Sequence, residues 1–448
     1  MADTDSKVLG VVLLVRHGDR QGFYQSPTTY TPSNTILTPL GNQQEFQLGT
    51  HLQSLYLNDS SPCRIEGISN TLVNYTQLRV RADAGGEAGV ILNSAQSLLQ
   101  GLFPANSNSS TVLANGTTIT APLAGYQYIP IESVEPQNDI SLEGWTSCNT
   151  FNQATSEFYN SLAFHHMASD HANFINSLSP YLDGRPVTLE NMWNIFDFMN
   201  VQSIHNAAFA RALPPTYLEQ ARYLANWHEY NVFSDPRPDG IKNIAGRTIL
   251  PSILAGFKSI VDPSDPVKFI YHAISYKPFI SLFNITRATE AVPGLAGIVD
   301  YAAAVALEVR QPPSGQPVLR FKFKNGTDPE LKRYPFFGSA TDVPLQDFVN
   351  SVEPLGIDSL SEWCTLCNNQ QDRGCGALNL AATSAVAANR PAIGSVGAGF
   401  LGAGVMLALA LAMFGVLLFL GVLTVGPGRS KRKRSATASV ASFSSRPC

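Results

Sequence analysis

Residues 8–20 read VLGVVLLVRHGDR, a run of aliphatic residues that ends abruptly in a cluster of polar ones. The part from Val8 to Val15 is rich in valine and apolar at nearly every position, which is typical of a strand buried on both faces of a parallel sheet. In open α/β sheets, ligands bind beyond the carboxyl ends of such strands. The sequence therefore predicts an α/β fold with a functional site at residues 16–20.

The polar cluster has the composition of a phosphate site. Arg16 and Arg20 carry guanidinium groups that can hold a phosphate through paired hydrogen bonds. They flank His17, and nearby positive charge disfavours the imidazolium form. A neutral imidazole can attack phosphorus and form a phosphohistidine, which divides one hydrolysis into two easier steps. The alternative is a turn at the end of the strand in which His17 has only a structural role.

Residues 37–56, LTPLGNQQEFQLGTHLQSLY, predict a helix that follows this strand. Thr38 can cap it, Pro39 suits its first position, and leucines recur on one side at helical spacing. An RHG strand followed by this helix resembles the histidine phosphatase superfamily, in particular its branch of acid phosphatases and phytases. The resemblance implies a phosphoglycerate-mutase-like open α/β sheet flanked by helices. It also implies that His17 is the nucleophile and that Arg16 and Arg20 bind phosphate.

The family resemblance continues in residues 78–104, LRVRADAGGEAGVILNSAQSLLQGLFP. In the family, one phosphate-binding arginine ends a strand and a second stands four residues before a Ser-Ala pair, which is Ser94-Ala95 here. Arg79 or Arg81 fits the first arginine, and we take Arg81 as the phosphate ligand. Val90 occupies the second position, so one arm of the phosphate clamp is missing. Losing one such donor costs several kcal/mol of transition-state binding.

A second apolar run, residues 267–271, predicts a strand that ends at His272. The family has a His-Asp or His-Glu pair at this point, whose histidine binds phosphate and whose acid protonates the leaving oxygen. His272 fits the first role, with a structural histidine of the core as the alternative, but Ala273 cannot fill the second. Loss of general acid catalysis commonly costs about 10²–10⁴-fold in rate. The side chains that remain as candidate proton donors are Tyr271, Ser275, Tyr276 and Lys277.

The composition changes along the chain predict six parts. They are a first α/β core segment (1–104), a mostly helical insertion (105–261), a second core segment (262–375), a stalk (376–395), a transmembrane helix (396–425) and a basic cytosolic tail (426–448). The insertion resembles the helical block that shapes access to the site in the family. It would therefore set the substrate preference.

The predicted anchor is apolar or glycine from 396 to 425 except at Thr424, which is longer than the roughly 20 residues needed to span a bilayer. A cluster of arginine and lysine at 429–434 marks the cytosolic flank. We therefore expect a single-pass protein whose body is lumenal or extracellular. MADTDSK at the start lacks the apolar stretch of a signal peptide, so we expect the true start to lie upstream.

Charge and cysteine content restrict the function further. Without the last 20 residues, the chain carries 24 basic and 34 acidic residues, a net charge of −10, which argues against nucleic-acid binding. Six Asn-X-Ser/Thr sequons favour a body outside the cytosol. In an oxidising lumen we expect disulfides among Cys63, Cys148, Cys364, Cys367 and Cys375. Because five is an odd number, one of these thiols would stay free. The alternative for Cys364-X-X-Cys367 is one half of a zinc site, but the sequence has no second CxxC or histidine pair to complete it.

These observations predict a membrane-anchored phosphomonoesterase of reduced activity that acts on phosphorylated small molecules. No metal or cofactor is expected, because arginines neutralise the phosphate in the family. The alternative is a catalytically inactive relative that binds a ligand or partner. A phosphoglycerate-mutase-like transferase is disfavoured by the long insertion and the anchor. We expect the imidazoles of His17 and His272 to meet Arg16 and Arg20 in one pocket.

Overall fold

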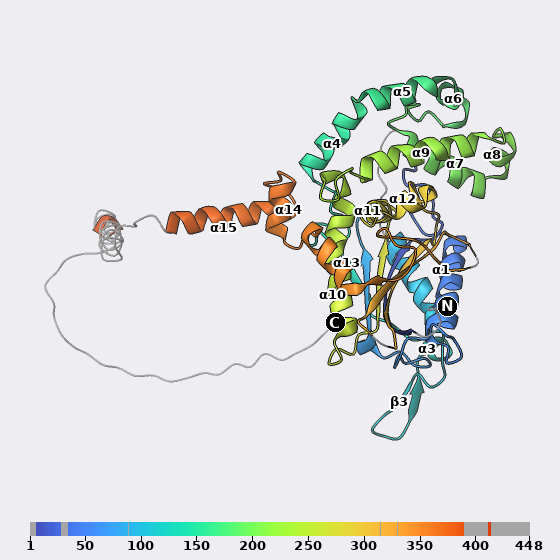
Figure 1. Ribbon diagram of the computed structural model, residues 1–448, viewed down its shortest axis with the longest axis vertical. Helices are drawn as coiled ribbons and strands as arrows, with labels where there is room; N and C mark the ends of the chain where they lie inside the picture. The colour runs from blue at the N-terminus through green and yellow to red at the C-terminus, as the bar shows by residue number, and fades with distance from the viewer. Residues whose placement is uncertain are drawn as a thin grey trace, which may run out of the picture. The chain divides into compact units, whose positions relative to one another are not determined.

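The computed structural model describes residues 6–27, 35–87, 89–313, 315–328, 330–388 and 411–413. The chain divides into two units, Met1–Asn379 and Leu380–Cys448. The first unit is built on an eight-stranded mixed sheet with the order β10-β8-β7-β1-β6-β2-β5, and β9 pairs with β8. Figure 1 shows this sheet with helices on both sides. The predicted open α/β sheet flanked by helices is confirmed.

The strand predicted from the aliphatic run, β1 (Lys7–Arg16), lies in the middle of the sheet. It pairs in parallel with β6 (Phe269–Ile274), which pairs in parallel with β2 (Leu78–Asp83). Beyond them lies β5 (Glu132–Val134), also parallel. Alternate residues of β1 pack into two separate hydrophobic clusters, one on each face of the sheet. The four parallel strands therefore end at one edge, where Arg16 is the last residue of β1.

The other half of the sheet is antiparallel. β7 (Ala304–Gln311) pairs with β1 and with β8 (Val318–Lys324). Two short strands, β9 (Lys332–Arg333) and β10 (Val343–Pro344), complete this side.

One face of the sheet is covered by α1 (Pro39–Leu52) and α2 (Val90–Leu102). Thr38 caps α1 as predicted, since its Oγ1 accepts a hydrogen bond from the Gly41 N–H at 3.1 Å. A π-helical turn, Gln53–Leu57, follows α1. The two helices approach so closely that a Cβ at Gly49 would lie 2.0 Å from the Leu98 carbonyl oxygen.

The opposite face is covered by α10 (Ile244–Val261), α11 (Lys277–Ile285) and α13 (Leu345–Val352). The segment Ile241–Val261 is long and apolar enough to cross a membrane, but 67% of its apolar window is buried inside the protein. This segment is therefore a core helix of the body. The predicted transmembrane helix, 396–425, lies outside the described residues except for 411–413.

Helices of the central third of the chain gather beyond the edge of the sheet at which β1 ends (Figure 1). They are α4 (Asn149–Tyr159), α5 (Leu162–Asp170), α6 (Ala172–Ser177), α7 (Met192–His205), α8 (Ala207–Ala212) and α9 (Tyr217–Phe233). At the other end, β3 (Ser110–Val112) and β4 (Thr118–Thr120) form a projecting hairpin, followed by α3 (Pro122–Gly125). Short turns of helix are α12 (Ala288–Ala291) and the 3-10 segments Tyr75–Gln77, Ser179–Tyr181, Ile241–Asn243, Pro293–Leu295 and Glu353–Leu355.

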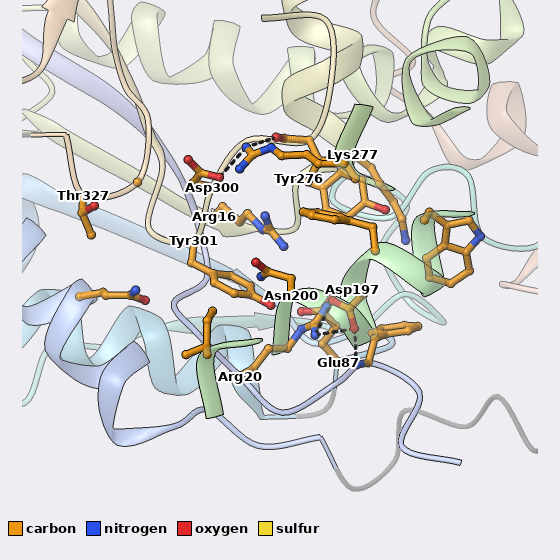
Figure 2. Close-up of a pocket in the computed structure, with 18 residues that line it drawn as sticks. Arg16, Arg20, Glu87, Asp197, Asn200, Tyr276, Lys277, Asp300, Tyr301 and Thr327 are labelled. Atoms are coloured by element: carbon orange, nitrogen blue, oxygen red, sulfur yellow. Dashed lines mark hydrogen bonds and ion pairs between the residues drawn. The ribbon is translucent and has the colours of Figure 1, made fainter. Parts of the chain in front are cut away.

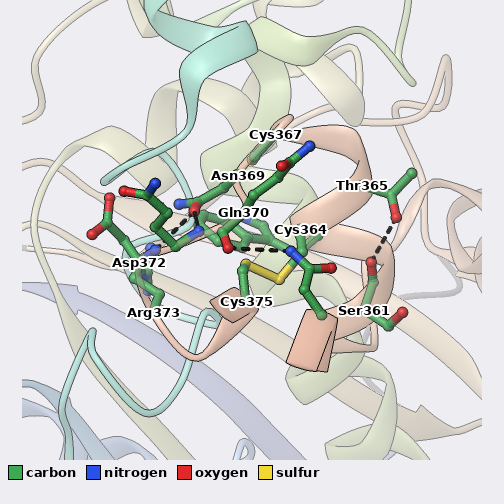
Figure 3. The surroundings of a disulfide bond; sticks show 12 residues. Ser361, Cys364, Thr365, Cys367, Asn369, Gln370, Asp372, Arg373 and Cys375 are labelled. Atoms are coloured by element: carbon green, nitrogen blue, oxygen red, sulfur yellow. Dashed lines mark hydrogen bonds between the residues drawn. A yellow bond between two sulfur atoms is a disulfide. The ribbon is translucent and has the colours of Figure 1, made fainter. Parts of the chain in front are cut away.

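One disulfide attaches the segment after α13 to the body, and a second closes a short loop within that segment. Cys148, just before α4, bonds to Cys367 at the end of α14 (Leu360–Leu366), and Cys364 bonds to Cys375 at the start of α15 (Cys375–Ala388). Figure 3 shows the second bond. Among the cysteines that the structure describes, Cys63 is the free thiol. Both cysteines of the CxxC pair are therefore bonded to partners elsewhere, and the zinc alternative fails.

Candidate active site

A pocket lies at the carboxyl edge of the parallel strands, between the sheet and α7 (Figure 2). Its cavity volume is about 200 Å³. The core contributes charged and aromatic side chains, and α7 closes the other side. The lining residues used below are Arg16, Arg20, Glu87, Asp197, Tyr276, Lys277 and Tyr301. The pocket therefore lies at the edge of the sheet where the sequence pattern placed Arg16 and Arg20.

His17 is held by the turn that ends β1. Its backbone N–H contacts the Ile274 carbonyl oxygen at 3.3 Å, and the Gly18 N–H donates to Ser94 Oγ at 3.1 Å. The ring Nδ1 lies 2.8 Å from the Gly18 carbonyl oxygen. Because a carbonyl can only accept, Nδ1 carries a proton, and Nε2 is the ring atom directed at the pocket side. Gly18 has no room for a side chain, since a Cβ would lie 2.5 Å from the Gly41 carbonyl oxygen.

Arg16 is a buried cation without a carboxylate partner among the described residues. Its Nη1 donates to the Val299 carbonyl oxygen. Its guanidinium carbon lies 4.5 Å from the ring centre of Tyr301 and 5.2 Å from that of Tyr276. Burial lowers the pKa of Arg16, yet a guanidinium stays protonated at any ordinary pH. The pocket therefore contains a positive charge that an anionic ligand can neutralise.

Arg20 lies on the other side of the pocket and is paired twice. Its Nη1 lies 3.0 Å from Asp197 Oδ1, and its Nη2 lies 3.3 Å from Glu87 Oε1. Figure 2 shows these two contacts. Arg20 therefore connects the core to α7, the helix that carries Asp197.

Glu87 is a site residue that the sequence analysis missed. It lies in the loop between β2 and α2, and its Oε2 is 2.7 Å from Nε2 of His17. Burial would raise the pKa of Glu87, but Arg20, His17 and Arg16 together hold it well below its usual value. The only signal in the sequence was an acidic residue in a glycine-rich loop just after a parallel strand. Burial also lowers the pKa of His17, and Glu87 opposes that shift.

His272 does not reach the pocket. β6 continues to Ile274, two residues past the predicted end, so His272 lies opposite Leu14 in the sheet interior. Neither of its ring nitrogens has a hydrogen-bond partner among the described residues. Ile274, rather than His272, contacts His17 where β6 ends, and Ser275 is the next residue of the chain. The expected meeting of the imidazoles of His17 and His272 in one pocket is therefore not found.

Arg81 also lies outside the pocket. It projects from β2 toward α10, where its Nε is 2.8 Å from Glu132 and its Nη2 is 2.6 Å from Asp139. Its Nη1 donates to Ser141 and Ser252. Two carboxylates already neutralise this guanidinium. The structure thus brings together Arg16, His17 and Arg20 but neither Arg81 nor His272.

Two further pocket residues come from the segment after β6. Tyr276 donates its hydroxyl to Glu229 Oε2 at 2.6 Å, and Glu229 Oε1 lies 2.9 Å from Nδ1 of His228. The ammonium of Lys277 lies 4.9 Å from the ring centre of Trp145. Tyr276 is therefore fixed by a buried polar chain that begins in α9. Among the described residues, no group of three or more His, Cys, Asp or Glu could hold a metal ion.

Comparison with known proteins adds three findings. A family model described as histidine phosphatase superfamily (branch 2) matches residues 7–324. Lysosomal acid phosphatase of Homo sapiens is 23% identical over 374 residues, covering 81% of each chain. Its Xenopus laevis counterpart is 22% identical over 364 residues, covering 79% of this chain and 78% of that one.

Solved structures agree at the level of the fold. Phytase from Citrobacter braakii superimposes with a TM-score of 0.54 at 13% identity, covering 81% of this chain and 99% of that one. Hafnia alvei phytase in complex with myo-inositol hexakis sulphate gives 0.54 at 12% identity, covering 80% and 98%.

Proposed function

Because the chain belongs to branch 2 of the histidine phosphatase superfamily, we propose that it is a phosphomonoesterase with His17 as nucleophile. The observation that carries the proposal is that Arg16 and Arg20 line one pocket at the edge of the sheet, and that Nε2 of His17 contacts Glu87, which lines the same pocket. The substrates would be phosphorylated small molecules, in keeping with relatives named as acid phosphatases.

The reaction uses the two arginines and the imidazole in separate roles. Nε2 of His17 attacks phosphorus, an N–P bond forms, and the bond from phosphorus to the leaving oxygen breaks. The leaving alkoxide takes a proton from solvent water and departs as the alcohol, and a second water then cleaves the N–P bond to release phosphate and restore His17. Arg16 and Arg20 balance the charge that the phosphoryl oxygens carry during both steps. The hydrogen bond from Nδ1 to Gly18 fixes the ring so that Nε2 faces phosphorus.

Activity would be low on substrates with poor leaving groups. The end of β6 offers Ile274 and Ser275, and neither is a carboxylic acid. Val90 is completely buried as the first residue of α2, so this position supplies no phosphate ligand. An alkoxide needs a proton to leave, and a missing general acid commonly costs about 10²–10⁴-fold.

The first experiment compares an aryl phosphate, whose leaving group barely needs a proton, with glycerol phosphate. We expect hydrolysis of the aryl ester at acid pH and hydrolysis of the alkyl ester slower by at least about 100-fold. His17→Ala should abolish both activities. Glu66→Gln should change neither, because Glu66 pairs with Lys7 at the amino end of β1, the end away from Arg16. Activity that survives His17→Ala would contradict the proposal.

A second candidate is a catalytically inactive protein that binds a ligand in this pocket. The contact between Nε2 of His17 and Glu87 favours it, because the nucleophilic atom faces a carboxylate. Binding of a phosphate analogue to a folded protein that turns over neither ester would support this candidate.

We also propose that the body lies outside the cytosol and is anchored through residues 396–425. Two disulfides in the body and sequons at exposed loops support this placement. Protease protection of the body in intact vesicles, with cleavage of the basic tail, is the expected result. Cleavage of the body in intact vesicles would contradict it.

A further inference from the structure

We propose that the Glu87 carboxylate occupies the anion subsite of the pocket and competes there with the phosphoryl group of the ligand. The inference concerns regulation of the site assigned above and therefore rests on the proposed function. In this view the Glu87 side chain holds the phosphate site closed until it moves away.

The contacts of Glu87 are those expected of a bound phosphate. One oxygen lies 2.7 Å from the nucleophilic nitrogen of His17, and the other lies 3.3 Å from the guanidinium of Arg20. The side chains of His17, Arg20 and Glu87 are exposed by only 0%, 3% and 9%. In so dry a site, two anions cannot share the same donors, because each needs the full compensation that those donors supply.

The charges around Glu87 lead to the same conclusion. The groups that keep Glu87 ionised against the effect of burial are Arg20, His17 and Arg16. These are the three groups assigned to the phosphoryl group. Arg16 forms no ion pair among the described residues, and the negative charge of Glu87 is one that acts on it in the pocket.

The contact also blocks chemistry directly. The 2.7 Å contact places a carboxylate oxygen of Glu87 against Nε2 of His17, the atom that would attack phosphorus. A phosphorus atom cannot approach Nε2 from that side while the carboxylate is there. Phosphoryl transfer therefore requires Glu87 to move away first.

The surroundings of Glu87 allow such a movement. It lines the cavity, so its carboxylate can rotate into open space. The nearest heavy atoms to a Cβ built at Gly86 and Gly89 would lie at 3.7 Å and 3.6 Å, so these two glycines have free space around them, although the Gly86 N–H donates to Glu143 at 3.2 Å. Glycine at these points lowers the steric cost of a change in backbone conformation.

Moving Glu87 out of the subsite costs free energy, and this cost lowers the apparent affinity for phosphate. If the open state holds about a tenth or less of the molecules, the apparent dissociation constant rises by about tenfold or more. Mild acid does not release Glu87 by protonating it, because the pKa of Glu87 lies well below its usual value. The carboxylate therefore stays ionised and in place under the conditions in which acid phosphatases are assayed.

The test measures binding of inorganic phosphate to the full chain by isothermal titration calorimetry at mildly acidic pH. Glu87→Ala vacates the subsite, and Glu87→Gln keeps its shape while removing its charge. We expect phosphate to bind at least tenfold more tightly to the alanine variant than to the wild type, with the glutamine variant also tighter. Glu66→Gln removes the same charge from an exposed ion pair with Lys7 and should bind like the wild type.

Phosphate affinity of Glu87→Ala equal to or weaker than that of the wild type would overturn the inference. If the alanine variant folds poorly, the rise in its melting temperature on adding phosphate, relative to the wild type, gives the same comparison. The readout does not depend on turnover. If the wild type has no phosphatase activity but Glu87→Ala gains affinity for phosphate, the proposed function is refuted and the inference is supported. If the wild type is active but Glu87→Ala gains no affinity, the proposed function is supported and the inference is refuted.

Discussion

The imidazole of His272 is buried inside the sheet, where no water can solvate the charge of its protonated form. Burial, and then the positive charge of Arg81, lower the pKa of His272 to about 3. In the unfolded chain the same ring takes up a proton below about pH 6.5. The unfolded state therefore binds more protons between those values, and His272 makes the protein less stable as the pH falls from about 6.5 toward 3. Above pH 6.5 it has no such effect.

Replacement of His272 by leucine should remove this sensitivity to acid. Between pH 7 and pH 4, we expect the wild type to lose about 3 kcal/mol more of its free energy of unfolding than His272→Leu does. Urea denaturation at both pH values measures the difference. His166→Leu, at an exposed position of α5, removes a histidine without the buried ring and should behave like the wild type. Equal losses in the wild type and His272→Leu would contradict the expected pKa.

Two helices show how closely the elements of the core approach each other. A Cβ at Gly49 in α1 would lie 2.0 Å from the Leu98 carbonyl oxygen, and one at Gly101 in α2 would lie 2.1 Å from the Phe46 carbonyl oxygen. Both obstacles are backbone atoms, so relief requires the helices to move apart. Because the same separation relieves both contacts, the two substitutions should couple.

We expect Gly49→Ala and Gly101→Ala each to lower the free energy of unfolding by about 1–3 kcal/mol. The double variant should lose less than the sum of the two. Gly294→Ala is the matched control, because no heavy atom lies within 4 Å of the added methyl group. It should change stability by less than about 0.5 kcal/mol. Chemical denaturation of the four variants checks this, and strict additivity would contradict a shared contact.

The strands were predictable in kind but not in length. The run before Arg16 could be read as a doubly buried strand because each residue from Val11 to Val15 is apolar. β6 is apolar too, and nothing in its local pattern distinguishes a strand that ends at His272 from one that ends at Ile274. The difference depends on the register with β1, a tertiary contact, and it moves one imidazole from the pocket into the core.

The missed role of Glu87 has a similar cause. Its loop is rich in glycine, and such a loop has no periodicity that would fix the direction of a side chain. The partners of Glu87 are 67 and 70 residues away, at Arg20 and His17. Local sequence therefore predicted the cations of the site but not the anion that faces them.

The pocket and the projecting hairpin lie at opposite ends of the body. The pocket lies beside α7, whereas the β3–β4 hairpin projects from the opposite end of the sheet (Figure 1). Asn108 and Asn115 belong to this hairpin region, and Asn58 and Asn74 lie on other exposed turns. Glycans at these four positions would not obstruct the pocket.

The two remaining sequons are different, because their amides hold the fold together. The side-chain N–H₂ of Asn284 donates to the Asp235 carbonyl oxygen at 2.8 Å and to Asn243 at 3.1 Å. That of Asn325 donates to Asp300 at 3.1 Å. A glycan on either amide nitrogen would break these bonds and would need space in a half-buried site.

We therefore expect the full chain, made in a eukaryotic cell, to carry N-glycans at Asn58, Asn74, Asn108 and Asn115 only. Enzymatic deglycosylation in heavy-oxygen water converts each occupied asparagine to a labelled aspartate, which peptide mass spectrometry detects. A glycan at Asn284 in the folded protein would contradict the hydrogen bonds described for that amide. A folded chain with no glycan at any exposed position would contradict a lumenal or extracellular body, because four accessible acceptors would not all escape the transferase there.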